Sequence, residues 1–293
     1  MIVWFLIALV SAFLSAFSAI TQKKVLFNIS ALEFSFVLSV VNLLLSIPMF
    51  FFIDYNTVSS LSLEILFVKS IIGVLAFLCV MLTLKNLQIS NALPLLALTP
   101  GFVAVFAFIF IGDKITLVEA AGLALFIAGT YIIESKNNKD LLSTFQVFIK
   151  SKSHHYILMA LMLFTASSIL DKLLLKKYSL PPVALIAFQH LFFAVIFYVI
   201  YIFNKKSSLT DLRKIPYKDL GLILLTSVLT IGYRYTQVLA VSMAPVALVL
   251  AIKRTSVFWA SLIGGRLFKD TNLLRKGIAV TIIVIGAILI LKD

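Results

Sequence analysis

The chain has 293 residues, 62% of them hydrophobic and only 13% charged, with a mean hydropathy of +1.12. Soluble domains are about half apolar and about a quarter charged, so this composition excludes an ordinary soluble domain. The net charge is +13 and the pI is about 9.8. The cations gather in short connections between apolar blocks, which indicates anionic lipid headgroups rather than nucleic acid as their partner. Cys79 is the single cysteine, so neither a disulfide framework nor a cysteine metal site is expected.

Apolar blocks of about 20 residues follow one another along the chain, the length at which a helix crosses roughly 30 Å of hydrocarbon. The first block lacks the basic n-region and small-residue cleavage site of a signal peptide, so we interpret it as a membrane span. The sequence predicts ten spans, at residues 2–21, 32–53, 63–84, 92–111, 117–133, 156–175, 183–203, 220–238, 244–263 and 277–291. The expected fold class is an all-α membrane protein with ten transmembrane helices and no separate soluble domain.

The two halves of the chain resemble each other. The run SNALPLLALTPGFVAVFAFIFIGDKI, from Ser90, aligns without a gap with SMAPVALVLAIKRTSVFWASLIGGRL, from Ser242. An earlier pair, FSAITQKKVL and SSILDKLLLKKY, matches more weakly. We therefore predict two five-helix repeats, at 1–134 and 156–293, with a polar connecting loop at 135–155. Because five is odd, the second repeat would enter the membrane from the opposite face, an inverted repeat with its site near the midplane.

This pattern resembles the EamA type of the drug/metabolite transporter superfamily across nearly the whole chain. The shared features are the ten spans, the five-plus-five repeat, and small residues with proline at the start of the fourth and ninth helices. A glycine-acid/base turn follows those helices. It reads GDKIT at 112–116, whereas its second copy, GGRLF at 264–268, lacks the acid. The resemblance implies a basket of ten helices that moves a small organic solute without ATP hydrolysis.

The cations of the expected loops lie mostly on the face opposite the two termini. Examples are Lys23, Lys85, Arg213, Arg266 and Arg275. Basic loops stay on the cytoplasmic side of a membrane, so the sequence predicts that both termini lie outside the cytoplasm.

Two adjacent cations, Lys253 and Arg254, lie in the apolar stretch LAIKRTSVFWA of the ninth span. Lys253 falls near the bilayer centre, where a cation costs about 2.5–3.5 kcal/mol, so it should face the bundle or a wet cavity. We predict that at least one of the two contacts the solute or a counter-ion. The alternative is that one pairs with a carboxylate while the other extends to the headgroups. The pair also resembles the sugar-phosphate branch of the superfamily, but the stretch LLALT before Pro100 lacks that branch's lysine. An anionic substrate follows, whereas phosphate specifically does not.

A second group of candidates lies in GYRYTQ of the eighth span. Arg234 and the flanking Tyr233 and Tyr235 would either line a central cavity, with hydroxyls that bind a polar solute, or anchor the helix at the headgroup level. The same two alternatives apply to Lys69 in the third span, and of these we favour a side chain that extends to the interface.

Few acids are available to pair with these cations or to couple transport to a proton gradient. Asp171, toward the end of the sixth span, is either a buried partner or a charge at a helix end. Glu33 is interpreted mainly as interfacial. His190 titrates near neutral pH when unperturbed, although a lone histidine in a bundle is more often only hydrogen-bonded. Pro100 interrupts the fourth span and is the predicted hinge.

Three functions remain open. The first is a secondary transporter of a small polar, anionic metabolite by alternating access. The second is a broad exporter of amino acids or amphipathic compounds, with the cations as structural pairs. The third, a membrane-embedded enzyme on lipid substrates, would need clustered acid/base or metal-ligand groups, and no Asp-rich magnesium motif occurs. We expect no enzyme, cofactor or metal, a multi-pass location in the cell (inner) membrane, and the lipid bilayer and a small-molecule solute as partners. A homodimer is left open.

Overall fold

The computed structural model describes residues 2–98, 116–134, 151–204, 212, 215–244 and 246–292. Within these ranges all regular elements are helices, so the all-α fold class is confirmed for the described part of the chain. The α-helices are α1 (Ile2–Val25), α2 (Ala31–Ser46), α3 (Ser60–Asn86), α4 (Ile89–Leu96), α6 (Leu117–Glu134), α8 (Lys152–Lys176), α9 (Pro182–Phe203), α11 (Tyr217–Met243), α12 (Val246–Leu267) and α13 (Leu273–Lys292). Two short 3₁₀ helices, η1 (Ile47–Phe52) and η2 (Tyr55–Thr57), follow α2.

Each predicted span overlaps one of these α-helices. Six helical segments among the described residues are long and apolar enough to cross a membrane: α1, α2 continued by η1, α3, α8, α9 and α11. The fourth predicted span is described only as far as α4 and the residues after it up to 98, and the rest of that span lies outside the described residues. The division into an inverted five-helix repeat stays a prediction.

Two helix boundaries differ from the hydropathy pattern for identifiable reasons. The second predicted span divides at Ser46, because Pro48 has no N–H to continue the α-helical ladder and the chain tightens into η1. Helix α8 begins at Lys152, within the expected connecting loop. The N–H groups of His154 and His155 donate to Ser151 O at 3.0 and 3.1 Å, which closes a helical turn made of polar residues. Hydropathy marks the apolar part of a helix, not its polar ends.

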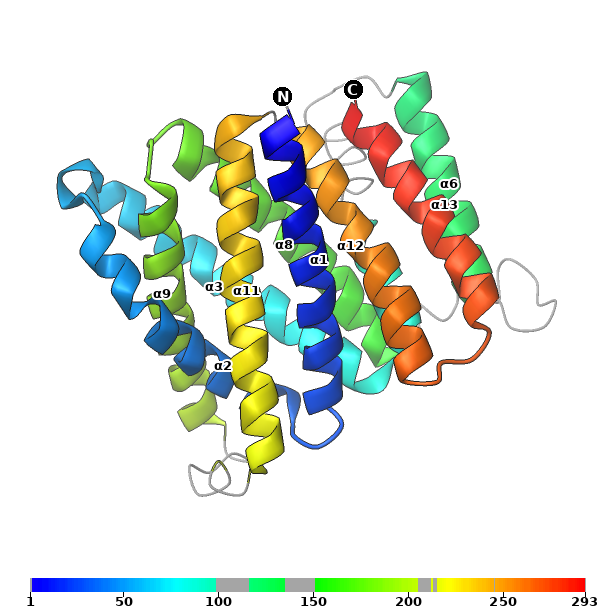
Figure 1. Cartoon of the computed structure of the whole chain (residues 1–293), viewed down its shortest axis with the longest axis horizontal. Helices are drawn as coiled ribbons and strands as arrows, with labels where there is room; N and C mark the ends of the chain where they lie inside the picture. Colours follow the sequence, from blue (N-terminus) through cyan, green and yellow to red (C-terminus); the bar gives the residue numbers. More distant parts are fainter. Residues whose placement is uncertain are drawn as a thin grey trace.

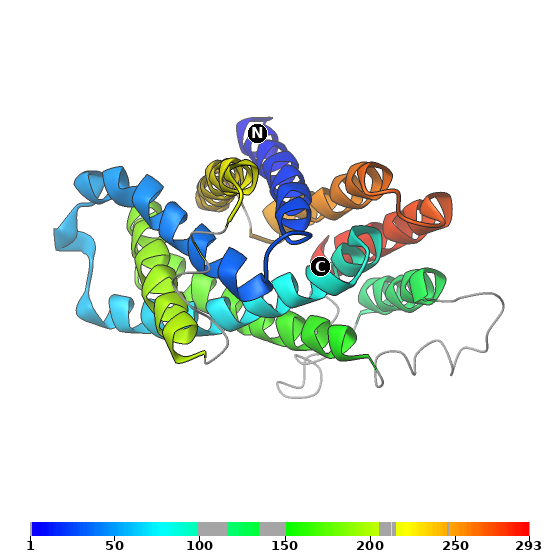
Figure 2. The same cartoon turned by 90° about the horizontal axis from the view of Figure 1, so that it is seen from below.

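The helices form an antiparallel bundle with both chain termini at the same end (Figure 1). Helix α1 packs along α11, α3 along α8, α2 against α9, and α6 against α13. Seen from below, α1 and α11 lie on one side of the bundle while α3 and α8 lie on the other (Figure 2). Helix α12 contacts α1, α4 and α13.

The distribution of polarity is that of a membrane protein. Large apolar side chains point outward, with Phe51 84% exposed, Phe52 81% and Phe203 81%. Charged and hydrogen-bonding side chains such as Lys69 and His190 are instead buried. A soluble monomer rarely exposes apolar patches on this scale, whereas lipid-facing helices do. The buried polar groups therefore need a separate explanation.

Candidate functional site

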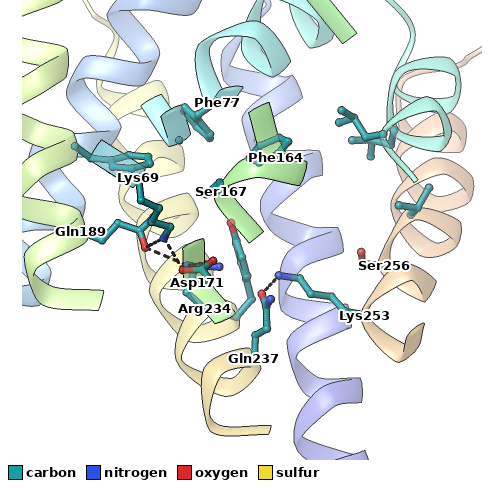
Figure 3. A pocket seen from close by; sticks show the side chains of 16 residues that line it. Lys69, Phe77, Phe164, Ser167, Asp171, Gln189, Arg234, Gln237, Lys253 and Ser256 are labelled. Carbon is teal, nitrogen blue, oxygen red and sulfur yellow. Dashed lines mark hydrogen bonds and ion pairs between the residues drawn. The ribbon is translucent and has the colours of Figure 1, made fainter. Parts of the chain in front are cut away.

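A cavity of about 310 Å³ lies between α3, α4, α8, α9, α11 and α12 (Figure 3). Its apolar wall includes Phe77, Leu93, Leu96, Phe164, Phe193 and Val257. The polar residues of its lining are Lys69, Ser167, Asp171, Gln189, Tyr233, Arg234, Gln237, Lys253 and Ser256. The volume is at the lower end of the range for small-molecule sites, and an apolar wall with a few convergent polar groups is typical of such sites.

One side of the cavity is organised around Asp171 of α8. The Lys69 Nζ of α3 lies 2.7 Å from Asp171 Oδ1, and the Arg234 Nη2 of α11 lies 3.7 Å from Asp171 Oδ2. Gln189 Oε1 of α9 accepts hydrogen bonds from both cations, at 2.9 Å from Lys69 Nζ and 3.0 Å from Arg234 Nη2. We call these four residues the Asp171 cluster, and Figure 3 shows their side chains converging from separate helices.

Burial explains why these groups are held together. The Lys69 side chain is only 1% exposed, whereas Arg234 is 18% and Asp171 25% exposed. A cation at membrane depth is costly unless it has a partner, and removing one member of a buried ion pair leaves the other uncompensated. Asp171 compensates the charge, and the carbonyl dipole of Gln189 occupies donors that the carboxylate does not reach.

Lys253 of α12 approaches the cavity from the side opposite Lys69 (Figure 3). Its Nζ donates a hydrogen bond to Gln237 Oε1 and lies 4.5 Å from the centroid of the Tyr233 ring. A cation over an aromatic face is attracted by the ring quadrupole. Tyr233 and Gln237 are four residues apart on α11, so they lie on one face of that helix. Lys253 is thereby held at the cavity wall.

The lining is positively charged. Among the described lining residues, Lys69, Arg234 and Lys253 are cations and Asp171 is the carboxylate. The arrangement concentrates donors around a small volume with low-dielectric walls, where the field of the cations is strong. Among the described residues, no cluster of His, Cys, Asp and Glu could hold a metal.

A smaller cavity of about 70 Å³ lies beside the first, and Phe77, Gln189, Phe193, Tyr233 and Arg234 line both. The polar stripe Ser35, Ser39 and Asn42 of α2 lines it as well, together with His190 and Thr230. Within the described structure the buried Asn42 Oδ1 has no hydrogen-bond partner.

The structure brings most of the predicted site residues together. Lys253, Arg234 and Tyr233 line the main cavity, and Asp171 is a buried partner rather than a charge at a helix end. The interpretation of Lys69 as an interfacial side chain is wrong, because it is buried and paired with Asp171. Arg254 belongs to α12, but its side chain lies outside the described part of the structure, as does the whole of Pro100.

Three other predicted residues lie away from the main cavity. Tyr235 is 40% exposed and is absent from the described lining of both cavities. Glu33 belongs to a capping box at the start of α2, where its Oε2 accepts from Ser30 N at 2.9 Å. His190 Nδ1 lies 3.0 Å from Ser46 Oγ and faces the smaller cavity. Their predicted roles in binding or coupling stay predictions.

Sequence reasoning missed two glutamines, Gln189 and Gln237, which accept hydrogen bonds from the cavity cations. Neutral amides carry no charge signal in a hydropathy profile. The usable signal was periodicity: Tyr233, Arg234 and Gln237 recur at helical spacing on one face of the eighth span.

The fold and this cavity define a polytopic membrane protein with a charged, solute-sized site among its helices. Residues 2–135 match the EamA-like transporter family. This match covers the first of the two predicted repeats and places that half of the chain with a family of membrane transporters in the drug/metabolite transporter superfamily, as the resemblance implied. The family consists of transporters rather than enzymes.

A further comparison bears on the fold. A solved structure, described only as the crystal structure of a protein, aligns with 95% of this chain and 96% of its own, with a TM-score of 0.60 and 12% identity. At that identity the likeness shows the fold alone. No curated protein matches the chain.

Proposed function

We propose that this transporter moves a small anionic metabolite across the cell (inner) membrane by alternating access. The observation that carries the proposal is that cations from three helices, Lys69 of α3, Arg234 of α11 and Lys253 of α12, line one cavity of about 310 Å³. Cations at membrane depth are costly and mark solute pathways. The volume suits a small metabolite.

Alternating access rests on the inverted repeat, which the helix contacts support. If each helix of the first half corresponds to one of the second, then α1, α2, α3, α4 and α6 exchange with α8, α9, α11, α12 and α13. The α1–α11 contact then maps onto α8–α3, and α2–α11 maps onto α9–α3. The pairs α2–α9, α4–α12 and α6–α13 map onto themselves, and all of these contacts occur. Rocking of one repeat against the other around a central site is the mechanism that such symmetry allows.

A second candidate is the export of amino acids or other amphipathic compounds. The observation that favours it is the combination of an aromatic wall, Phe77, Phe164, Phe193 and Tyr233, with a carboxylate, Asp171, that is 25% exposed. An ammonium group could bind Asp171 while the solute's carboxylate meets Lys253. The excess of cations over carboxylates in the described lining favours the anionic solute.

One experiment separates these candidates. Purified protein in detergent is screened for a rise in melting temperature with acidic, zwitterionic and basic metabolites, and Lys253→Ala is compared with wild type. We expect acidic metabolites to stabilise wild type and to lose at least about tenfold in apparent affinity, roughly 1.4 kcal/mol, in the variant. The matched control is Tyr235→Phe, on an exposed side chain outside the cavity lining. Stabilisation by zwitterions alone, or equal shifts in Lys253→Ala, would reject the anionic solute.

The expected orientation has its own test. If both termini lie outside the cytoplasm, an antibody should label a C-terminal tag on intact cells. For this test the layers outside the inner membrane are removed, and the inner membrane stays closed. Labelling only after permeabilisation would contradict the inference from loop charge.

A further inference from the structure

The cavity has a carboxylate of its own. Asp171 lies in the cavity wall with a quarter of its side chain exposed, and it faces the same two cations that an anionic solute would seek. Its two oxygens are held unequally. Lys69 Nζ is 2.7 Å from Oδ1, a close ion pair, whereas Arg234 Nη2 is 3.7 Å from Oδ2, beyond hydrogen-bond distance. Arg234 therefore has donor capacity to offer a second carboxylate.

The rest of the Asp171 cluster leaves room for such an exchange. Gln189 Oε1 accepts hydrogen bonds from both Lys69 and Arg234, so each cation has a neutral partner in addition to Asp171. Ser167, one turn before Asp171 on α8, also lines the cavity. The cations thus keep a neutral partner if a solute takes the place of the carboxylate.

The corresponding place in the other helix pair has no charge. Thr226 Oγ1 of α11 donates to Thr21 Oγ1 of α1 at 2.8 Å. Lys69 and Thr226 each stand nine residues after the first residue of their helix, and Asp171 and Thr21 each stand nineteen residues after theirs. The alignment of FSAITQKKVL with SSILDKLLLKKY also pairs Thr21 with Asp171. One helix pair carries an ion pair where its counterpart carries a threonine pair.

We propose that Asp171 is a built-in competitor of the solute: a carboxylate-bearing solute displaces it from Lys69 and Arg234, and it returns when the site empties. This inference rests on the proposed anionic transport and names the solute's chemistry as a carboxylate, because the site's own ligand is one. The internal carboxylate keeps the two cations compensated when no solute is bound. Uncompensated cations at this depth would oppose reorientation of the empty carrier.

The test uses acetate as the probe, so it does not depend on knowing the natural solute. Asp171→Ala removes the competitor and leaves space beside both cations. A tethered ligand competes at an effective concentration of about a millimolar or more, so we expect acetate to bind Asp171→Ala at least about tenfold more tightly than wild type. The measurement is the rise in melting temperature against acetate concentration, with sodium chloride at equal ionic strength as the reference.

The matched control is Thr21→Ala, at the equivalent position of the neutral pair. It removes a hydrogen bond between helices but no charge, so acetate should stabilise it no more than it stabilises wild type. If Asp171→Ala does not yield folded protein, the isosteric Asp171→Asn replaces it with the same expectation. Lys69→Gln combined with Asp171→Asn should abolish the gain, because the principal cation is missing.

The outcomes separate this inference from the proposed function. Equal acetate affinity in wild type and the Asp171 variants overturns the competitor, even if acidic metabolites still stabilise wild type through Lys253. Tighter acetate binding in the Asp171 variants supports the competitor. If no acidic metabolite stabilises or is transported by the wild-type protein, the proposed anionic transport is rejected. The acetate measurements on the Asp171 variants then still decide whether Asp171 competes with a carboxylate.

Discussion

The helix pairs α3–α8 and α1–α11 are built alike but joined differently. The helices of each pair pack along each other, and the two pairs lie on opposite sides of the bundle (Figure 2). In α3–α8 the contact at the equivalent depth is the Lys69–Asp171 ion pair, whereas in α1–α11 it is the Thr226–Thr21 hydrogen bond. The backbone architecture therefore does not require charge at this depth, because one pair forms without it. The charge in α3–α8 is better explained by what the cavity binds than by what holds the helices together.

The largest expected effect, on stability, comes from removing one of the two charges that pair between α3 and α8. Asp171→Leu removes the carboxylate and leaves Lys69, which is 1% exposed, without its ion-pair partner. Breaking a buried pair costs about 3–5 kcal/mol, and the cost here is expected at or below the lower end because Asp171 is 25% exposed. The melting temperature of the purified protein measures the effect.

The double variant Lys69→Met with Asp171→Leu tests whether charge or packing is responsible. It removes both charges, so it should recover much of the lost stability, making α3–α8 resemble the neutral pair. A double variant that is less stable than Asp171→Leu alone would show that the ion pair is a structural requirement, contrary to the comparison with α1–α11.

The second effect concerns transport rather than stability. In proteoliposomes, Asp171→Asn should slow net uptake of an acidic metabolite by at least about tenfold, while exchange of that metabolite across a preloaded vesicle is retained. The reason is that only net uptake requires the empty carrier to reorient with Lys69 and Arg234 uncompensated. The measurement is the ratio of exchange to net uptake. A variant that loses both equally has a defect in binding or folding, which would contradict the role assigned to Asp171.

The third effect compares the two glutamines. Gln189→Leu removes the acceptor shared by Lys69 and Arg234, and Gln237→Leu removes the acceptor of Lys253. Hydrogen bonds to charged groups contribute about 1.5–3 kcal/mol. Gln189→Leu should cost more stability because two cations lose a partner, whereas Gln237→Leu should mainly change solute affinity. Equal melting temperatures for the two variants would argue against the Asp171 cluster as a unit.

The sequence predicted the helices well and the site in part, for separate physical reasons. Apolar blocks of membrane length fix where helices lie, and each predicted span overlaps a helix of the described chain. Lys253, Arg234 and Tyr233 were identified because charge and aromatic side chains are conspicuous in an apolar run. The contact between Lys69 and Asp171 was not predicted. These two residues are about a hundred positions apart in the chain, and they meet only because α3 packs against α8.

The same limit explains the residues that were misjudged. Lys69 looked interfacial because its distance from the helix start was the only guide to its depth. Tyr233 and Tyr235 looked equivalent on either side of Arg234, but side chains two positions apart on a helix point about 200° apart. In the structure Tyr233 lines the cavity, whereas Tyr235 is 40% exposed. Helix rotation is set by packing between helices, which a span's own composition does not fix.

The smallest expected effect concerns the uncharged helix pair, α1–α11, which the Thr226–Thr21 hydrogen bond joins. Thr226→Val removes the hydroxyl that donates to Thr21 Oγ1 while it keeps the side-chain volume almost unchanged. A neutral hydrogen bond contributes about 0.5–1.5 kcal/mol, so the melting temperature should fall slightly. Anion affinity and the ratio of exchange to net uptake should stay at wild-type values, because no charge near the cavity changes. Altered anion affinity in Thr226→Val would mean that the two helix pairs are coupled, so that the solute acts on both.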